Sequence, residues 1–188
     1  GEGVVRIGGY DGEVAVNGEG IVVDSFQVVP LALTGESAIM TLQKVVVTDS
    51  LLLVHSDNRL LVFDKEGHFV RCMGKEGRAP GEYVRLNTFF VNREQGTVGM
   101  VDEALGKVLT FSMRGDFLSE RKYGKGVFEM LHGASLVQDS VLLCDYYVTQ
   151  GEFPLYALVN LATGEKRGLL ASAVRSDGAA ELVGRAPV

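Results

Sequence analysis

The sequence predicts an all-β fold, a β-propeller of four-stranded antiparallel blades, with about three to three and a half blades in this chain. The first observation is a repeat: residues 61–70 recur 48 positions later as residues 109–118, and more faintly after another 48 as residues 157–164. The second is that each copy is an apolar run followed by a polar turn containing Gly, while helical periodicity is nearly absent. A period of about 40 to 50 residues built from hairpins is typical of a propeller. Three to three and a half blades would make a partial or half propeller.

Four strands are expected in each repeat, within one domain spanning residues 1–188. The expected blades are residues 38–80, with strands at 42–47, 51–54, 59–63 and 69–72; residues 81–124, with strands at 84–91, 97–101, 107–111 and 117–122; and residues 125–172, with strands at 130–136, 141–144, 155–159 and 166–170. Residues 1–37 are expected to add N-terminal strands at 13–16, 21–23 and 26–33. The tail, residues 173–188, is expected to be irregular: a short helix, an irregular strand or a ragged end.

Composition limits the classes of function. At 188 residues, 46% hydrophobic and 22% charged, the chain can bury a sizeable core. A net charge of −6, with no run of Lys or Arg longer than two residues, argues against nucleic acid as a partner, because such binding neutralises phosphates. No apolar stretch reaches the length of about 18 residues expected of a transmembrane segment. Cys72 and Cys144 lack C-x-x-C spacing and are expected to be buried, reduced thiols.

The junction between the first two expected blades carries a specific motif. Residues 73–83 read Met-Gly-Lys-Glu-Gly-Arg-Ala-Pro-Gly-Glu-Tyr, which resembles the inter-blade signature G-x-x-G-x-G-P-G-E-Y. That signature belongs to a family of six-bladed, NHL-like β-propellers exported by gut Bacteroidetes, of uncharacterised function. The resemblance covers residues 26–165 and departs at Ala79, where the family more often has Gly. It implies a periplasmic or cell-surface location and makes the protein a lipoprotein candidate.

The motif also has a physical interpretation as a crossing between blades. Three glycines permit positive φ there: Gly74, Gly77 and Gly81. Pro80 fixes φ, and Tyr83 is expected to pack between the blades. Arg78 and Glu82 are expected to form an ion pair across the junction. A phosphate-binding Walker loop is excluded, because its spacing of glycines and Lys is different.

Six blades of this size would need about 300 residues, so a partial ring would leave two apolar blade faces uncovered. Three explanations stay open: the chain is a fragment, two copies associate to complete the ring, or the tail covers one open face. Because two-fold pairing is the commonest homo-oligomer symmetry, we predict a homodimer.

Candidate site residues lie after the second strand of each expected blade. His55, Asp102 and Asp145 are expected at equivalent places near one rim of the central channel, where carboxylates would coordinate a hard cation or, alternatively, form Asx turns. No metal site is predicted, because the histidines have no clustered partners. Tyr146 and Tyr147 begin a long aromatic loop, expected either to contact a protein or glycan or to pack against a neighbouring blade. The predicted ligand-contact residues are therefore Asp102, Asp145, Tyr146 and Tyr147.

Catalytic motifs are missing from the sequence. There is no G-x-S-x-G elbow, and His132 and Ser135 lie close together without an acid that can be assigned to orient the His. We therefore predict a non-catalytic binding module without a cofactor, which contacts an unknown protein or glycan through a propeller face. Two alternatives stay open: a hydrolase or lyase with a metal in the central channel, as in the lactonases and lyases among related six-bladed propellers, and a structural scaffold whose exposed blade edges pair with another chain.

Overall fold

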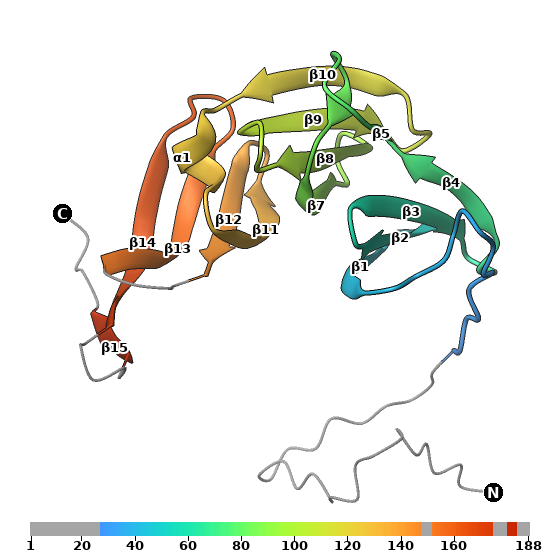
Figure 1. The fold of residues 1–188 in the computed structure, drawn as a ribbon, viewed down its shortest axis with the longest axis horizontal. Coiled ribbons are helices and arrows are strands. Elements are labelled where there is room, and N and C mark those ends of the chain that lie inside the picture. The colour runs from blue at the N-terminus through green and yellow to red at the C-terminus, as the bar shows by residue number, and fades with distance from the viewer. Residues whose placement is uncertain (1–26, 148–151, 175–179, 184–188) are drawn as a thin grey trace, which may run out of the picture.

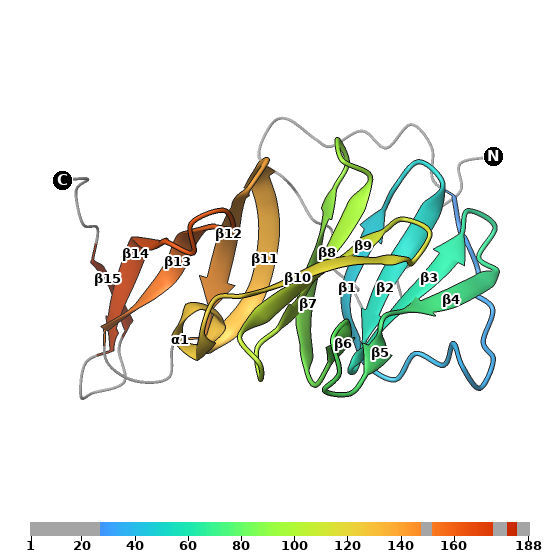
Figure 2. The same ribbon diagram turned by 90° about the horizontal axis from the view of Figure 1, so that it is seen from above.

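The computed structural model describes residues 27–147, 152–174 and 180–183. Three antiparallel sheets of consecutive strands follow one another along an arc, like wedges of a wheel (Figure 1). Seen from above, the second sheet stands between the first and the third (Figure 2). The predicted all-β architecture of propeller blades is therefore confirmed.

Each sheet is a meander in which the first strand lies on the concave side of the arc (Figure 1). The first blade contains β1 (Leu42–Val47), β2 (Leu51–Ser56), β3 (Arg59–Asp64) and β4 (Phe69–Met73); the second contains β7 (Leu86–Asn92), β8 (Thr97–Asp102), β9 (Lys107–Ser112) and β10 (Phe117–Lys122); the third contains β11 (Leu131–Gln138), β12 (Val141–Tyr146), β13 (Glu152–Asn160), β14 (Lys166–Val174) and β15 (Ala180–Val183). The inner strands β1, β7 and β11 thus border the centre of the arc.

The ends of the chain differ from the expectation. In the third blade, β15 pairs with β14 as a fifth strand, so part of the expected irregular tail is regular sheet. Residues 27–33 form no strand, contrary to the expected strand at 26–33, and Pro30 lacks the N–H that a ladder needs. The strands expected at 13–16 and 21–23 lie outside the described residues. A short helix, α1 (Lys125–Phe128), precedes the third blade.

The core consists of two apolar layers between neighbouring blades. Between the first and second blades, Leu53, Val62, Phe89 and Met100 are fully buried. Between the second and third blades, the layer includes Cys144. The outward face of the first blade forms a smaller cluster covered by the preceding segment: Leu31 and Ile39 pack against Val54, Leu61 and Phe63.

The two cysteines differ in burial. Cys144 is buried between blades as predicted, whereas Cys72 is exposed, contrary to the prediction. Cys72 lies on β4, the outermost strand of the first blade, where alternate side chains face solvent.

The junction motif forms a parallel pair of two-residue strands, β5 (Lys75–Glu76) and β6 (Glu82–Tyr83). Gly74 has φ of 72°, and a Cβ there would lie 3.1 Å from the Tyr83 ring. Tyr83 is buried between the first two blades, as predicted. A side chain at Gly74 would therefore meet both an unfavourable backbone conformation and a crowded core.

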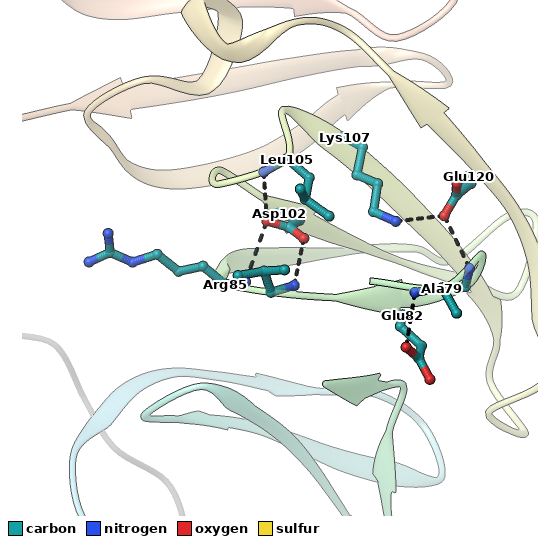
Figure 3. Close-up of polar contacts among 9 residues, drawn as sticks. Ala79, Glu82, Arg85, Asp102, Leu105, Lys107 and Glu120 are labelled. Carbon is teal, nitrogen blue, oxygen red and sulfur yellow. Dashed lines mark hydrogen bonds and ion pairs between the residues drawn. The ribbon is translucent and has the colours of Figure 1, made fainter. Parts of the chain in front are cut away.

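The predicted ion pair between Arg78 and Glu82 is wrong. The Glu82 carboxylate instead pairs with Lys75 Nζ at 3.1 Å. It also accepts the Ala79 N–H at 3.0 Å, as Figure 3 shows. The reason is the strand register, which places Lys75 directly opposite Glu82. The Ala79 hydrogen bond and then the Lys75 contact hold the Glu82 pKa below its usual value.

Candidate functional site

A hollow of about 930 Å³ lies where the inner strands of the three blades converge. This volume is in the range of ligand pockets. Residues from all three blades line it, among them Lys44, His55, Arg85, Asn87, His132 and Asp145. We call this space the central hollow.

A β-bulge is repeated at the start of the inner strand in all three blades. The register shifts between Leu42 and Lys44 in β1, between Leu86 and Thr88 in β7, and between Leu131 and Gly133 in β11. The extra residues are Gln43, Asn87 and His132, and all three line the central hollow. A bulge redirects a side chain, and bulges are frequent beside active sites. The same backbone feature thus presents three different polar side chains, which we call the bulge residues, to one space.

The strand register corrects one expectation about the rim. His55 of β2 is equivalent to Val101 of β8 and Asp145 of β12, because each pairs with the residue that follows the bulge. Asp102 is instead equivalent to Ser56 and Tyr146. The three residues His55, Asp102 and Asp145 therefore do not occupy equivalent places, because Asp102 is the last residue of its strand whereas His55 and Asp145 are the second to last of theirs.

Asp102 is fully buried and organises the main chain (Figure 3). Its carboxylate accepts N–H bonds from Val84 at 2.8 Å, Leu105 at 3.1 Å and Arg85 at 3.4 Å. The bond from Leu105 closes the turn after β8, which is the turn-forming alternative raised by the sequence. Asp102 therefore fixes the entry to β7 and is not among the residues that line the hollow.

Asp145 and His132 form a pair inside the hollow. His132 Nδ1 lies 2.5 Å from Asp145 Oδ2, so Asp145 is the orienting acid that the sequence left unassigned. A Cβ at Gly133 would lie 2.6 Å from Asp145 Oδ1, so the carboxylate occupies space that only a glycine leaves free. The pair fixes the imidazole and leaves its second ring nitrogen for another contact.

The two tyrosines have different surroundings. Tyr147 is 56% exposed and lines the hollow, and its ring meets the His132 ring edge-on, with 4.6 Å between the centroids. Tyr146 is buried between the second and third blades, and its hydroxyl donates to the Val127 carbonyl at 3.0 Å. The hollow thus brings Asp145 and Tyr147 together, whereas Tyr146 packs between blades.

Lys44 links all three inner strands. Its Nζ donates to the carbonyl oxygens of Phe89 in β7 at 2.8 Å and of Ala134 in β11 at 2.6 Å. Burial lowers the Lys44 pKa, and the nearby Asp145 carboxylate partly opposes that effect. The only sequence signal was a Lys beside a run of valines, because its partners lie in other repeats.

His55 pairs with Lys44 in the sheet and is 1% exposed. Its Nε2 is buried without a hydrogen-bond partner among the described residues, and its ring meets Phe89 edge-on at 6.4 Å. Burial lowers the His55 pKa, so the ring favours the neutral form.

A second polar cluster lies in the turn between β3 and β4. Ligand atoms of Asp64, Glu66 and His68 lie within 4.8 Å of one another. The Asp64 carboxylate accepts the main-chain N–H groups of Glu66 and His68 and contacts His68 Nδ1 at 2.9 Å. These bonds within the turn account for the compact arrangement.

Comparison with known proteins identifies the family. The family model for a domain of unknown function, DUF4934, matches residues 16–172. No curated protein matches the chain significantly. None of the helices in the described parts of the chain is long and apolar enough to cross a bilayer.

Two solved structures are similar in fold. One is a protein of Bacteroides fragilis NCTC 9343 described as exported, with 25% identity and a TM-score of 0.57, over 70% of this chain and 38% of that one. The other is a member of the DUF4221 family from Bacteroides vulgatus ATCC 8482, with 10% identity and a TM-score of 0.55, over 74% of this chain and 45% of that one. The chain therefore spans less than half the length of both, and the family match over residues 16–172 shows that it belongs to the DUF4934 family.

Proposed function

We propose that this chain is a non-catalytic binding domain whose ligand, a glycan or protein, enters the central hollow. The observation that carries the proposal is the bulge repeated in three blades, which presents Gln43, Asn87 and His132 to one space. Repetition of this feature argues for a built site, since a bulge interrupts a ladder of hydrogen bonds.

The walls of the hollow are fixed by hydrogen bonds between blades. Asn58, from the first blade, donates to the Val84 carbonyl at 3.1 Å and accepts the Leu86 N–H at 2.7 Å. Asn87, from the second blade, donates to the Leu131 carbonyl at 2.8 Å. Such preorganisation supports binding, because less freedom is lost when a ligand is held.

Binding without turnover is supported by the surroundings of His132. Its ring bonds to Asp145, but no described Ser, Thr or Cys side chain is hydrogen-bonded to it, as the nucleophile of a hydrolytic triad would be. The enzyme alternative, a hydrolase or lyase with a channel metal, predicts that the protein retains stoichiometric calcium or zinc after exhaustive dialysis. Metal-free protein with full ligand affinity would favour the binding module.

We also propose that the protein is exported, to the periplasm or the cell surface, as a lipoprotein candidate. The similarity to the Bacteroides fragilis protein described as exported supports this location.

Two copies are proposed to associate as a homodimer that completes a six-bladed ring. Apolar side chains exposed on the first and third blades support the pairing: Val45, Val47, Val137 and Tyr156. The alternative is a structural scaffold, in which these exposed faces pair with another chain and no ligand is bound. It predicts association without any ligand in the hollow.

The binding proposal is tested by thermal unfolding with soluble saccharides, short peptides and nucleotides. A ligand that binds only the folded state raises the melting temperature. One of these three ligand classes should raise the melting temperature of the native protein, and should raise that of His132→Ala less. The control is His68→Ala, whose His lies in the β3–β4 turn, and it should respond like the native protein. If no class stabilises the protein, or if His132→Ala responds like the control, the hollow is not the binding site.

A further inference from the structure

We propose that the ligand of the central hollow is a saccharide bearing a carboxylate, held by Arg85 and Tyr147 together with His132. The inference rests on the proposed binding function and specifies its ligand class.

Arg85 provides the cationic contact. It lies immediately before β7, its main-chain N–H donates to Asp102, and its exposed side chain lines the hollow. Its guanidinium extends away from the second blade and touches none of the other residues drawn in Figure 3. A free guanidinium matches a carboxylate through two parallel hydrogen bonds.

The other charges in the hollow have partners within the protein. Lys44 donates to two carbonyl oxygens, and Asp145 bonds to His132. The Asp57 carboxylate accepts a hydrogen bond from the Ser56 hydroxyl at 3.1 Å. The Arg85 side chain has neither an ion pair nor a hydrogen bond among the described residues, so it is the charged group left for a ligand.

Tyr147 and the bulge residues provide contacts suited to a sugar ring. The exposed Tyr147 ring offers an apolar face with a polar hydroxyl at its end, and the His132 ring supports it edge-on. Gln43, Asn87 and His132 end in planar polar groups of the kind that bond to sugar hydroxyls. Asn87 would do so through its amide oxygen, because its amide nitrogen already donates to the Leu131 carbonyl and the Glu103 carboxylate. The lining is therefore suited to a polyhydroxylated ligand rather than to a lipid.

An extended peptide fits the hollow less well. Peptides that add to a sheet pair with the free main-chain groups of an edge strand. Lys44 already occupies the carbonyl oxygens of Phe89 in β7 and Ala134 in β11. Two inner edges are thus partly closed to strand addition.

The test is isothermal titration calorimetry with matched oligosaccharides. The probes are tetramers of galacturonate, glucuronate and mannuronate, each compared with the tetramer whose carboxylates are reduced to alcohols. At least one acidic tetramer should bind about tenfold or more tightly than its neutral counterpart, as one charge-assisted contact would give.

Variants assign the contacts. Arg85→Gln should lower affinity for the acidic tetramer about tenfold and leave the neutral one unchanged, while Tyr147→Ala should weaken both. Arg114→Gln, which makes the same charge change on an exposed turn between β9 and β10, should bind like the native protein. Melting temperatures within about 2 °C of the native value show that the variants fold.

Several outcomes would overturn the saccharide proposal: equal affinity for acidic and neutral tetramers, unchanged discrimination in Arg85→Gln, or no binding of any tetramer. If peptides stabilise the protein through His132 while tetramers do not bind, the ligand class is wrong but the binding site stands. If no saccharide, peptide or nucleotide stabilises the native protein more than His132→Ala, the proposed function fails as well.

Discussion

The ammonium of Lys44 in β1 lies 2.6 Å from the main-chain oxygen of Ala134 in β11, 90 residues further along the chain. The same ammonium bonds to the Phe89 carbonyl in β7. One side chain therefore connects the inner strands of three blades at the centre of the arc. The shape of the central hollow and the packing of the blades are coupled through this residue.

Replacing Lys44 with Met should destabilise the protein by about 1–3 kcal/mol, because two half-buried carbonyl oxygens lose their donor. Urea unfolding at pH 7 measures the change. Lys122→Met is the control, since Lys122 is exposed at the end of β10, and it should shift stability by less than about 0.5 kcal/mol. Equal effects of the two substitutions would show that the Lys44 contacts are not stabilising.

Replacing His55 with Leu should stabilise the protein by about 1 kcal/mol, because a buried ring nitrogen without a partner is removed. The equivalent place in the second blade is held by an apolar residue, Val101. Urea unfolding at pH 7 again measures the change, and a less stable variant would contradict this interpretation of His55.

His55 also predicts a pH dependence. Because burial holds its pKa below the ordinary 6.5, the unfolded chain binds a proton first as the pH falls. Stability should therefore decrease from about pH 6.5 downwards in the native protein. His55→Leu should lack this contribution. Its free energy of unfolding should therefore change less between pH 6.5 and pH 5 than that of the native protein. Identical slopes in both proteins would contradict the prediction.

Glu120→Gln should cost about 3 kcal/mol at pH 7, because Lys107 is 2% exposed and its Nζ lies 2.7 Å from the Glu120 carboxylate. Figure 3 shows this pair and the hydrogen bond from the Gly81 main chain to the same carboxylate. Glu165→Gln, at an exposed position, is the matched control.

The Lys107 contact lowers the Glu120 pKa from its ordinary 4.5, so the contribution is fully present above that pH. It should be lost as the pH falls through the lowered pKa. The difference between the native protein and Glu120→Gln should therefore shrink in acid. A difference that is constant from pH 7 to pH 3 would mean that the pair is not the cause.

Gly133→Ala should disturb the hollow without unfolding the blade. The added Cβ would lie 2.6 Å from Asp145 Oδ1, so the carboxylate must move away from His132. Ligand affinity should fall several-fold, and the ¹⁵N signals of the His132 ring should lose the signature of a fixed tautomer. Gly126→Ala is the control, because a Cβ there meets nothing within 4 Å. Unchanged ring signals in Gly133→Ala would show that Asp145 does not hold the imidazole.

Light scattering tests the proposed assembly. We expect a mass of two chains, since apolar side chains such as Val45 and Val47 are exposed on the first blade. Val45→Lys should weaken the pairing, because it places a charge on that face. A monomer at micromolar concentration would contradict the homodimer.

The sequence predicted the blades well because their signals are local. In the second blade, the expected strands at 107–111 and 117–122 nearly coincide with β9 and β10, since apolar alternation and glycine turns mark each hairpin. The site was less predictable. Lys44 bonds to partners 45 and 90 residues away, and the bulges at Gln43, Asn87 and His132 depend on strand register, which no single segment of sequence specifies.

The most direct test of the account is one NMR titration of ¹⁵N-labelled protein with the saccharides and peptides described above. The side-chain amides of Gln43 and Asn87 and the imidazole of His132 come from three different blades. A shared binding site predicts that all three signals shift together and saturate at the same ligand concentration. Shifts confined to one blade, or to the outward faces of the first and third blades, would contradict the central hollow as the binding site.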